Sequence, residues 1–309
     1  MRWPQGRSFA FTIFDDTDLS VPGNFERVYD CLGELGFRTT KSVWPLTSKG
    51  QLARDVEGSS CDDPAYLRYV LQLQANGFEI GYHNSSHTGF TREGVVRALD
   101  RFRELFGHDP YTMTNHQQNP EAMYWGAARL SQPLSTVYRM AQRGVGTRAA
   151  GQDPSSPYFW GDICQQRIKY VRGFVFPEVN TLAACPAMPY HDPQRPYVRA
   201  WFASTYGSWW SDFRVALSPQ RQDELEESGG ACIIYAHVGA QFQDTDGSLR
   251  PEFKQLMSRL SRLNGWFVPV HEMLDYMVKE KGLAKLSWTQ RQAQEWRWFG
   301  HKIKVRGTE

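Results

Sequence analysis

Short apolar runs alternate along the chain with longer segments in which apolar residues recur at helical spacing. The segments expected to form strands are 8–14, 37–44, 78–82, 111–114, 168–176, 213–217, 231–236 and 266–270. The segments expected to form helices are 22–35, 64–75, 91–106, 219–227, 251–263 and 271–281. Regular alternation of strands with helices predicts a mostly parallel sheet or a β/α barrel.

Glycines end several of these expected helices. Gly36 follows the first, Asn76 and Gly77 follow the second, and Gly107 follows the third, as expected of residues that adopt the left-handed backbone of a helix end. The region 117–215 is less regular, with many proline, glycine and aromatic residues. It provides only two of the expected strands.

The composition is that of an ordinary globular protein. Of the 309 residues, 41% are hydrophobic and 22% are charged, which is enough to bury a large core. The formal net charge of +2 gives no electrostatic case for binding nucleic acid, which requires a concentrated basic face. The 11 Trp, 14 Tyr and 18 Phe belong mostly to the core, but such rings also suit stacking on sugars.

The cysteines and the N-terminal sequence favour a reducing compartment. Five scattered cysteines without a C-x-x-C pair form neither a disulfide framework nor a thiolate zinc site. The first residues contain no apolar signal-peptide region, and no run of 18 apolar residues occurs. We therefore expect a cytoplasmic protein.

The last segment, 281–309, differs from the rest in composition. It contains seven Lys or Arg residues against two Glu, together with Trp288, Trp296 and Trp298. We expect a barrel over residues 1–280, and a C-terminal extension that packs on it as a solvated helix with a short strand. The alternative is a contact of this basic, Trp-containing tail with an acidic glycan or with the inner membrane surface.

Two adjacent carboxylates, Asp15 and Asp16, end the first expected strand. In a β/α fold, reactive groups gather at the carboxyl ends of strands. Two carboxylates at a strand-to-loop turn can both reach one pocket there, one to bind a metal and one to act as a base. Such a pair is also common at ordinary turns and helix caps.

Two histidines, His83 and His87, follow the strand 78–82 in the motif H-N-S-S-H. Imidazoles at positions i and i+4 can face one metal ion if the segment turns helically. A third histidine, His237, ends the apolar strand 231–236. Each of these histidines alone has an ordinary structural explanation, and only their order along the chain makes them informative.

The order of F-D-D, then H-N-S-S-H, then a late strand that ends in His resembles the polysaccharide deacetylase family, the NodB-homology or family 4 carbohydrate esterases. The resemblance covers roughly residues 8–275 and implies a distorted β/α barrel that removes acetyl groups from sugars. It implies that Asp16, His83 and His87 hold the metal, that Asp15 is the base and that His237 is the acid. A carboxylate with two imidazoles suits Zn, and also Co, Ni or Fe.

The chain departs from the family pattern in several places. Ile13 and Thr17 stand where the family has threonine and glycine, and Asn84 replaces the serine or threonine after the first histidine. The third family segment corresponds to 107–116, which contains no arginine. Asn115 or His116 would take its place in orienting the base, and Asp162 or Asp212 would support His237.

We expect a metal-dependent deacetylase that acts on an acetylated sugar, or on a lipid- or nucleotide-linked glycan precursor of a bacterial surface polysaccharide such as lipopolysaccharide or capsule. One alternative is a non-catalytic sugar-binding or assembly module that retains the deacetylase fold. Another is a metal-dependent hydrolase of C–N bonds that are not in sugars.

Overall fold

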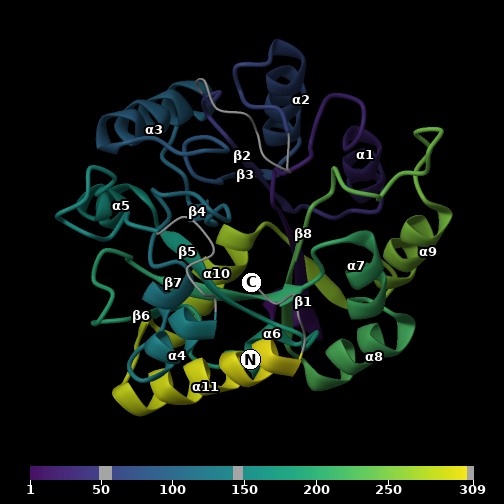
Figure 1. Cartoon of the computed structure of the whole chain (residues 1–309). Helices are drawn as coiled ribbons and strands as arrows, with labels where there is room; N and C mark the ends of the chain where they lie inside the picture. The colour runs from purple at the N-terminus through teal and green to yellow at the C-terminus, as the bar shows by residue number, and fades with distance from the viewer. Residues whose placement is uncertain (49–57, 142–148, 305–309) are drawn as a thin grey trace.

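Parallel strands close into a ring in the computed structural model, which describes residues 1–48, 58–141 and 149–304 (Figure 1). Around the ring, β1 pairs with β2, followed by β3, β4, β5, β7 and β8, and β8 pairs again with β1. The bounds are β1 Phe9–Asp15, β2 Thr40–Val43, β3 Glu79–Tyr82, β4 Thr112–Met113, β5 Tyr170–Phe176, β7 Trp201–Tyr206 and β8 Ala231–Ala236. The short β4 and a register shift between β5 and β7 distort the ring. The expected distorted β/α barrel is therefore confirmed.

Helices surround the barrel in Figure 1. They are α1 Glu26–Glu34, α2 Pro64–Ala75, α3 Arg92–Phe106, α4 Leu134–Ala141, α5 Gly161–Arg167, α6 Thr181–Ala184, α7 Trp210–Ala216, α8 Pro219–Ser228 and α9 Pro251–Leu260. In α3 the apolar residues Val95, Leu99, Phe102 and Phe106 lie one turn apart and are buried, because that stripe faces the barrel. Gly107, at a φ of 82°, ends the helix in the left-handed conformation.

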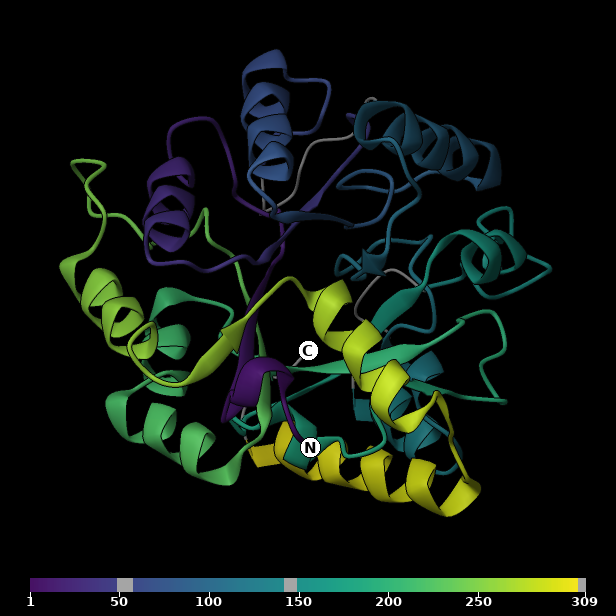
Figure 2. The same cartoon turned by 180° about the vertical axis from the view of Figure 1, so that it is seen from behind.

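Further elements complete the fold. Helix α10, Val270–Lys281, lies across the end of the barrel that faces the viewer in Figure 2. This is the amino end, because Thr40 and Glu79, at the starts of β2 and β3, accept hydrogen bonds from the first residues of α10. The remaining elements are η1 Pro4–Gly6, η2 Gly126–Arg129, β6 Tyr190–His191, β9 Gly265–Phe267, β10 Ala284–Lys285 and α11 Trp288–Lys304.

The segment 213–217, expected to be a strand, belongs instead to helix α7. Its apolar residues continue a helical stripe in which Trp210, Phe213 and Ala216 are buried at a spacing of three. The Asp212 carboxylate accepts a hydrogen bond from the backbone N–H of Trp209 at the start of the helix. The strand of this region is β7, which was not predicted from the sequence.

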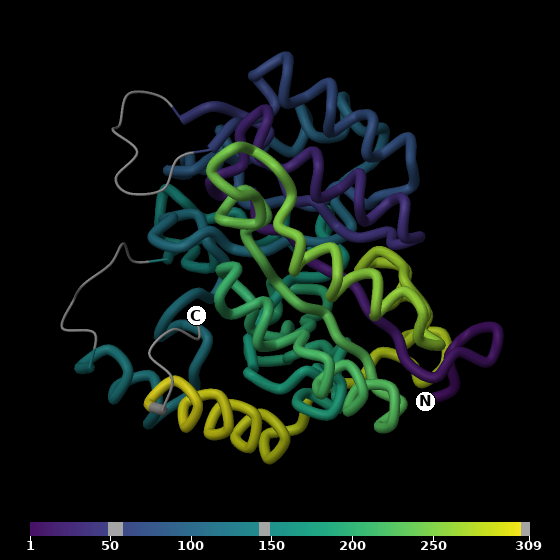
Figure 3. The backbone as a smooth tube through the Cα atoms, turned by 90° about the vertical axis from the view of Figure 1, so that its right-hand side faces the viewer, coloured from purple at the N-terminus to yellow at the C-terminus, as the bar shows by residue number. Residues whose placement is uncertain are grey.

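The C-terminal segment runs along the outside of the barrel (Figure 3). Strand β10 pairs with β6, and α11 follows it. The Trp298 side chain is fully buried against Tyr138 and Phe174, whereas Trp288 and Trp296 are more than half exposed. Among the residues that the structure describes, no helix is both long enough and apolar enough to cross a membrane. All five cysteines are buried and free.

Candidate active site

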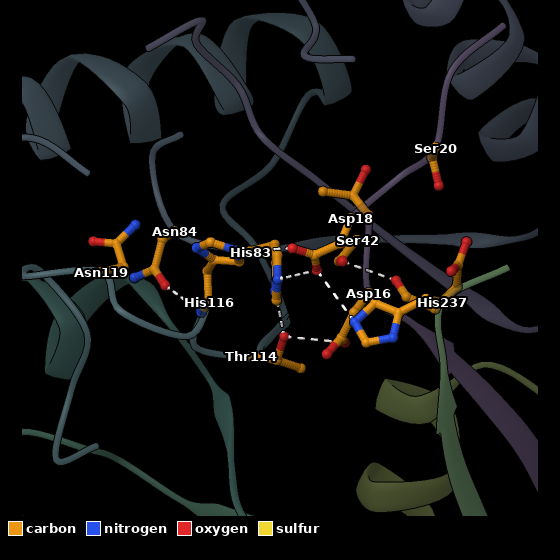
Figure 4. Close-up of polar contacts among 12 residues, drawn as sticks. Asp16, Asp18, Ser20, Ser42, His83, Asn84, Thr114, His116, Asn119 and His237 are labelled. Atoms are coloured by element: carbon orange, nitrogen blue, oxygen red, sulfur yellow. Dashed lines mark hydrogen bonds and ion pairs between the residues drawn. The ribbon is translucent and has the colours of Figure 1, made fainter. Parts of the chain in front are cut away.

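A cavity of about 360 Å³ opens at the carboxyl ends of the barrel strands. Such a volume is within the usual range for a small-molecule site. Its polar lining includes two carboxylates and three imidazoles, namely Asp16, Asp18, His83, His116 and His237. Figure 4 shows these side chains converging from the segments that follow β1, β3, β4 and β8. The position agrees with the placement of reactive groups in β/α barrels.

A tight turn after β1 presents Asp18 to the cavity. The backbone N–H of Ser20 donates to the carbonyl of Thr17, and Leu19 takes a φ of 62°, which is rare for a leucine. Gly239 lies against this turn, where a Cβ would come within 2.6 Å of the Leu19 backbone. The turn therefore depends on a neighbouring residue without a side chain, and such local strain is typical of functional sites.

Three imidazoles surround the Asp18 carboxylate, which is buried. The Nε2 atom of His83 lies 2.9 Å from Asp18 Oδ2, and the Nε2 atom of His116 lies 2.8 Å from Oδ1. The Nε2 atom of His237 lies 3.4 Å from Oδ2. Burial by itself raises the pKa of Asp18, but the charges of His116 and His83, with hydrogen bonds from His116 and His237, outweigh it and hold that pKa well below its usual value of 3.8. Asp18 is therefore an anion surrounded by imidazole nitrogens.

The hydroxyl of Thr114 fixes the tautomer of His83. This hydroxyl donates to Asp16 Oδ1 at 3.2 Å and lies 2.5 Å from His83 Nδ1. Because a hydroxyl has one proton, Thr114 accepts from His83, and we infer that Nδ1 carries the hydrogen. With Nδ1 turned to Thr114, the Nε2 atom of His83 points at the Asp18 carboxylate. That arrangement is favourable only with a positive charge between the two groups, either a proton or a metal ion.

Asp16 is held by an arginine that enters from the barrel interior. Arg172, on β5, donates from its two terminal nitrogens to the two carboxylate oxygens of Asp16, at 3.0 and 2.5 Å. Both side chains are only 1% exposed. The guanidinium also lies 4.4 Å from the ring centroid of Tyr235. A buried bidentate pair of this kind fixes the orientation of the carboxylate.

His237 stands on the other side of Asp18 from His116 (Figure 4). Its Nδ1 atom lies 2.9 Å from the hydroxyl oxygen of Ser208 and 3.2 Å from the carbonyl oxygen of the same residue. Since a carbonyl only accepts, Nδ1 carries a hydrogen. The Nε2 atom of His237 therefore faces the cavity, with Trp209 packed 5.5 Å from the imidazole between ring centroids.

The loop that carries His83 is organised by two polar side chains. Asn84 takes a φ of 63°, which asparagine tolerates better than serine or threonine, and its side-chain oxygen accepts from the backbone N–H of His116 at 2.6 Å. The Glu121 carboxylate accepts from the backbone N–H groups of Ser85 and Phe90, at 2.5 and 2.7 Å. The asparagine at position 84 therefore has a local structural role.

Burial raises the pKa of Glu121 from 4.5 to about 7, although its two backbone donors act against the shift. The folded state then keeps this proton up to about pH 7, while the unfolded chain releases it near pH 4.5. We expect stability to fall by about 3 kcal/mol as pH rises across this window. Thermal unfolding of the metal-free wild type and of Glu121→Gln between pH 4.5 and 7.5 tests this. The Glu121→Gln variant should lack the fall in stability that the release of this proton causes. If the stabilities of the wild type and the variant fell in parallel as pH rises, the prediction would be contradicted.

Asp15, expected to be the base, does not line the cavity. Its carboxylate pairs with Lys41 at 2.9 Å, with neither side chain exposed. It also accepts from the Tyr29 hydroxyl at 2.8 Å and from the backbone N–H of Val238 at 2.9 Å. All of these partners lie within the protein. The carboxylate of Asp15 therefore lies outside the cavity, where a base was not expected to lie. The side chain of Asp15 turns away from the cavity, while that of Asp16 turns into it.

The expected metal set of Asp16, His83 and His87 also differs from the observed geometry. The described residues form two groups whose ligand atoms all lie within 4.8 Å of one another, namely Asp18 with His83 and His116, and Asp16 with Asp18 and His237. His87 belongs to neither group. Its ring lies 4.8 Å from that of His116 and borders a separate cavity beside Trp44. Burial lowers the pKa of His87, and the adjacent His116 lowers it further.

The residues expected to take supporting roles are divided between the site and the surface. Asn115 and His116 line the cavity, and the Asn115 side chain makes two hydrogen bonds to the backbone of Met123. Asp162 forms a partly exposed pair with Arg92, and Asp212 caps helix α7. Neither of these two carboxylates lines the cavity, and the support for His237 comes from Ser208 instead.

Asp18 and Arg172 were not predicted from the sequence as site residues, and neither were Thr114 and Ser208, whose hydroxyl groups contact the site. Asp18 follows the expected F-D-D motif by only two positions, and D-x-D spacing is itself a recognisable signal. Arg172 is a single charge within the apolar strand Tyr170–Phe176. A buried charge requires a partner, so this residue could have been flagged as half of an ion pair, although its partner could not have been named.

Two solved structures supply an independent comparison. The chain aligns with a Mycobacterium smegmatis protein described as a polysaccharide deacetylase, at 12% identity and a TM-score of 0.52, over 93% of this chain and 96% of the other. The fold is that of the polysaccharide deacetylases. A Pseudomonas aeruginosa protein described in the same way aligns at 13% identity and a TM-score of 0.48, over 91% and 95% of the two chains. No family model matches the sequence, and no curated protein matches it.

Proposed function

We propose that this protein is a metal-dependent deacetylase of an acetylated carbohydrate. The observation that carries the proposal is the buried, arginine-held carboxylate of Asp16 beside Asp18, with His237 on the same cavity. Asp16, Asp18 and His237 offer ligand atoms within 4.8 Å of one another. A base, a cation site and an acid within this distance match the requirements of acyl-group hydrolysis.

Asp18, His83 and His116 are the residues that would hold the cation. Their donor set, one carboxylate and two imidazoles, suits zinc and leaves a position for water or substrate. The tautomer imposed on His83 by Thr114 supports the assignment, because it leaves Nε2 free to bind a cation. When bound, such an ion polarises an acyl carbonyl and lowers the pKa of water.

The protein's own groups then divide the proton transfers between them. Asp16 accepts a proton from the attacking water, with Arg172 and Thr114 holding its carboxylate in position. His237 delivers a proton from Nε2 to the leaving nitrogen or oxygen of the sugar, while Ser208 holds Nδ1. This assignment moves the base from Asp15 to Asp16, and the carboxylate ligand from Asp16 to Asp18.

The substrate that we propose is an acetylated sugar, either free or in a lipid- or nucleotide-linked precursor of a surface polysaccharide. Support comes from the volume and lining of the cavity. Its volume suits one sugar ring, and Tyr206 and Trp209 line it together with the polar groups. Flat aromatic side chains offer apolar faces against which the C–H groups of a sugar pack.

Metal content measured by elemental analysis tests the cation site. After dialysis against zinc, the wild type should retain about one equivalent. His83→Ala and His116→Ala should each lose most of it, because each removes one of three ligands. His87→Ala is the matched control, an imidazole in the same region that lies outside the proposed set, and it should retain the metal.

The alternative outcomes each contradict one part of the proposal. Retention by His116→Ala together with loss by His87→Ala would restore His87 as a ligand. A wild type that binds no zinc, cobalt or nickel would favour a non-catalytic sugar-binding module. A metal-loaded protein that hydrolyses ureides or imides, and releases no acetate from acetylated sugars, would assign the site to other C–N bonds.

A further inference from the structure

The most exposed large apolar side chains among the described residues gather on helices α4 and α11. Met140 on α4 is 74% exposed, and Ile303 and Trp288 on α11 are 68% and 65% exposed. Val137 and Trp296, on the same two helices, are about half exposed. Large apolar residues that are scattered singly over a surface are ordinary, but their concentration on two neighbouring helices indicates an interaction surface.

The two helices lie side by side at one edge of the barrel (Figures 1 and 3). Tyr138 on α4 and Trp298 on α11 are buried between them, with their ring centroids 5.6 Å apart. Trp296 and Ile303 are seven residues apart, so they lie on one face of α11, two turns from each other. Helix α11 therefore has one side that faces the core and an apolar side that the core does not cover.

The charges of these helices fit an anionic surface. Glu295 is the only acidic residue in α4 and α11, and it is fully buried. The Glu178 carboxylate beside α11 is paired with Arg297. Arg139 on α4 is exposed, and so is Lys285 just before α11. A second copy of the chain on this face would bring the same basic residues together, which opposes self-association, whereas anionic lipid headgroups would attract them.

The apolar side of α11 ends beside the candidate active site. Lys302, the neighbour of Ile303 in the last turn of α11, lines the cavity of that site. A membrane in contact with α4 and α11 would therefore lie next to the cavity. Docking in this position gives the cavity access to a sugar attached to a lipid, without the need to extract the lipid from the membrane.

We propose that this protein binds an anionic membrane surface through the exposed apolar residues of α4 and α11. Met140, Trp296 and Ile303 insert among the lipid headgroups, and Arg139 pairs with lipid phosphates. The contact itself does not depend on the reaction. Its consequence, that the acetylated sugar reaches the cavity as part of a lipid-linked precursor, rests on the deacetylase function proposed above.

Cosedimentation of the full chain with lipid vesicles tests the proposal. Vesicles with about 30% phosphatidylglycerol should bind the wild type about tenfold more tightly than vesicles of phosphatidylcholine alone, and added salt should reduce this difference. The double variant Trp296→Gln/Ile303→Gln should bind the phosphatidylglycerol vesicles about tenfold more weakly than the wild type. Arg139→Gln should reduce the preference for phosphatidylglycerol.

Matched controls make similar changes on other surfaces. Leu71→Gln/Val215→Gln replaces two exposed apolar residues, on α2 and α7, and Arg68→Gln removes an exposed arginine of α2. Both controls should bind vesicles as the wild type does. Thermal unfolding of each variant checks that the fold is retained, as expected for substitutions at exposed positions.

Equal binding by the wild type and Trp296→Gln/Ile303→Gln, or no binding of the wild type to either kind of vesicle, would overturn the proposal. A dimer that this double variant dissociates, detected by sedimentation velocity, would instead assign the face to a second copy of the chain. Acetate release from a soluble acetylated sugar is the separate measurement of the proposed function. The double variant should retain it, because neither residue lines the cavity. A protein that binds vesicles but releases no acetate would support the membrane contact and count against the deacetylase function.

Discussion

Replacing Asp16 with asparagine should lower kcat for acetate release by about a thousandfold and leave the bound metal in place. Asparagine has the shape of aspartate but cannot accept the proton of an attacking water. Metal retention is expected because Asp18, and not Asp16, lies within hydrogen-bond distance of both His83 and His116. The measurement is acetate release from the tightest-binding acetylated sugar, with metal content determined on the same preparation.

Asp162→Asn is the matched control for this experiment. Asp162 is also paired with an arginine, Arg92, but both side chains are more than 40% exposed and neither lines the cavity. Its replacement should leave turnover unchanged. If Asp16→Asn kept wild-type turnover, Asp16 would not be the base. If it lost the metal, the ligand role first expected for Asp16 would be restored.

Much of the fold could be predicted from the sequence, because the spacing of apolar residues indicates which face of a helix or strand is buried. Helix α2 has the bounds expected of it, residues 64–75, because Asp63 accepts hydrogen bonds from its first turn and the chain turns at Asn76 and Gly77. The elements of the region 117–215 were harder to predict, because local periodicity does not determine them. Its elements are stabilised by contacts distant in sequence, such as the pairing of β7 with β5 and β8, which local patterns do not reveal.

The location of the candidate site could be predicted from the sequence, whereas the orientation of its side chains could not. Asp15 and Asp16 are neighbours, so they project to opposite sides of the chain, and the sequence alone does not say which side faces the cavity. The structure decides through their partners. Lys41 stands opposite Asp15 in the register of β1 and β2, while Arg172 reaches Asp16 from β5, more than 150 residues later.

The same limit applies to the histidines. His83 and His87 share a motif, but His116 approaches Asp18 more closely than His87 does because Asn84 holds the backbone of His116 against the loop. That hydrogen bond joins segments that are 32 residues apart. A motif identifies which residue types are available, whereas the packing of two loops determines which of them meet.

Replacing Lys41 with methionine should destabilise the protein by about 3–5 kcal/mol. Lys41 is fully buried, and its ammonium pairs with Asp15 at 2.9 Å and donates to the Ser20 hydroxyl at 2.9 Å. Methionine has a similar volume but leaves the Asp15 carboxylate buried without its countercharge. The free energy of unfolding, measured by urea titration of the metal-free protein, provides the check. Lys169→Met is the matched control and should cost at most about 1 kcal/mol, because its pair with Asp275 is about 40% exposed.

A double-mutant cycle with Asp15→Asn makes the test specific for the ion pair. Each single variant leaves one buried charge without its partner, so the double variant should lose clearly less stability than the sum of the two. The Asp15 carboxylate also accepts from Val238, next to His237, and belongs to the segment that carries Asp16 and Asp18. Loss of the Asp15 carboxylate should therefore reduce turnover chiefly by destabilising the segment that carries Asp16 and Asp18. If Asp15→Asn were as stable as the wild type but inactive, Asp15 would act in catalysis after all, as first expected from the sequence.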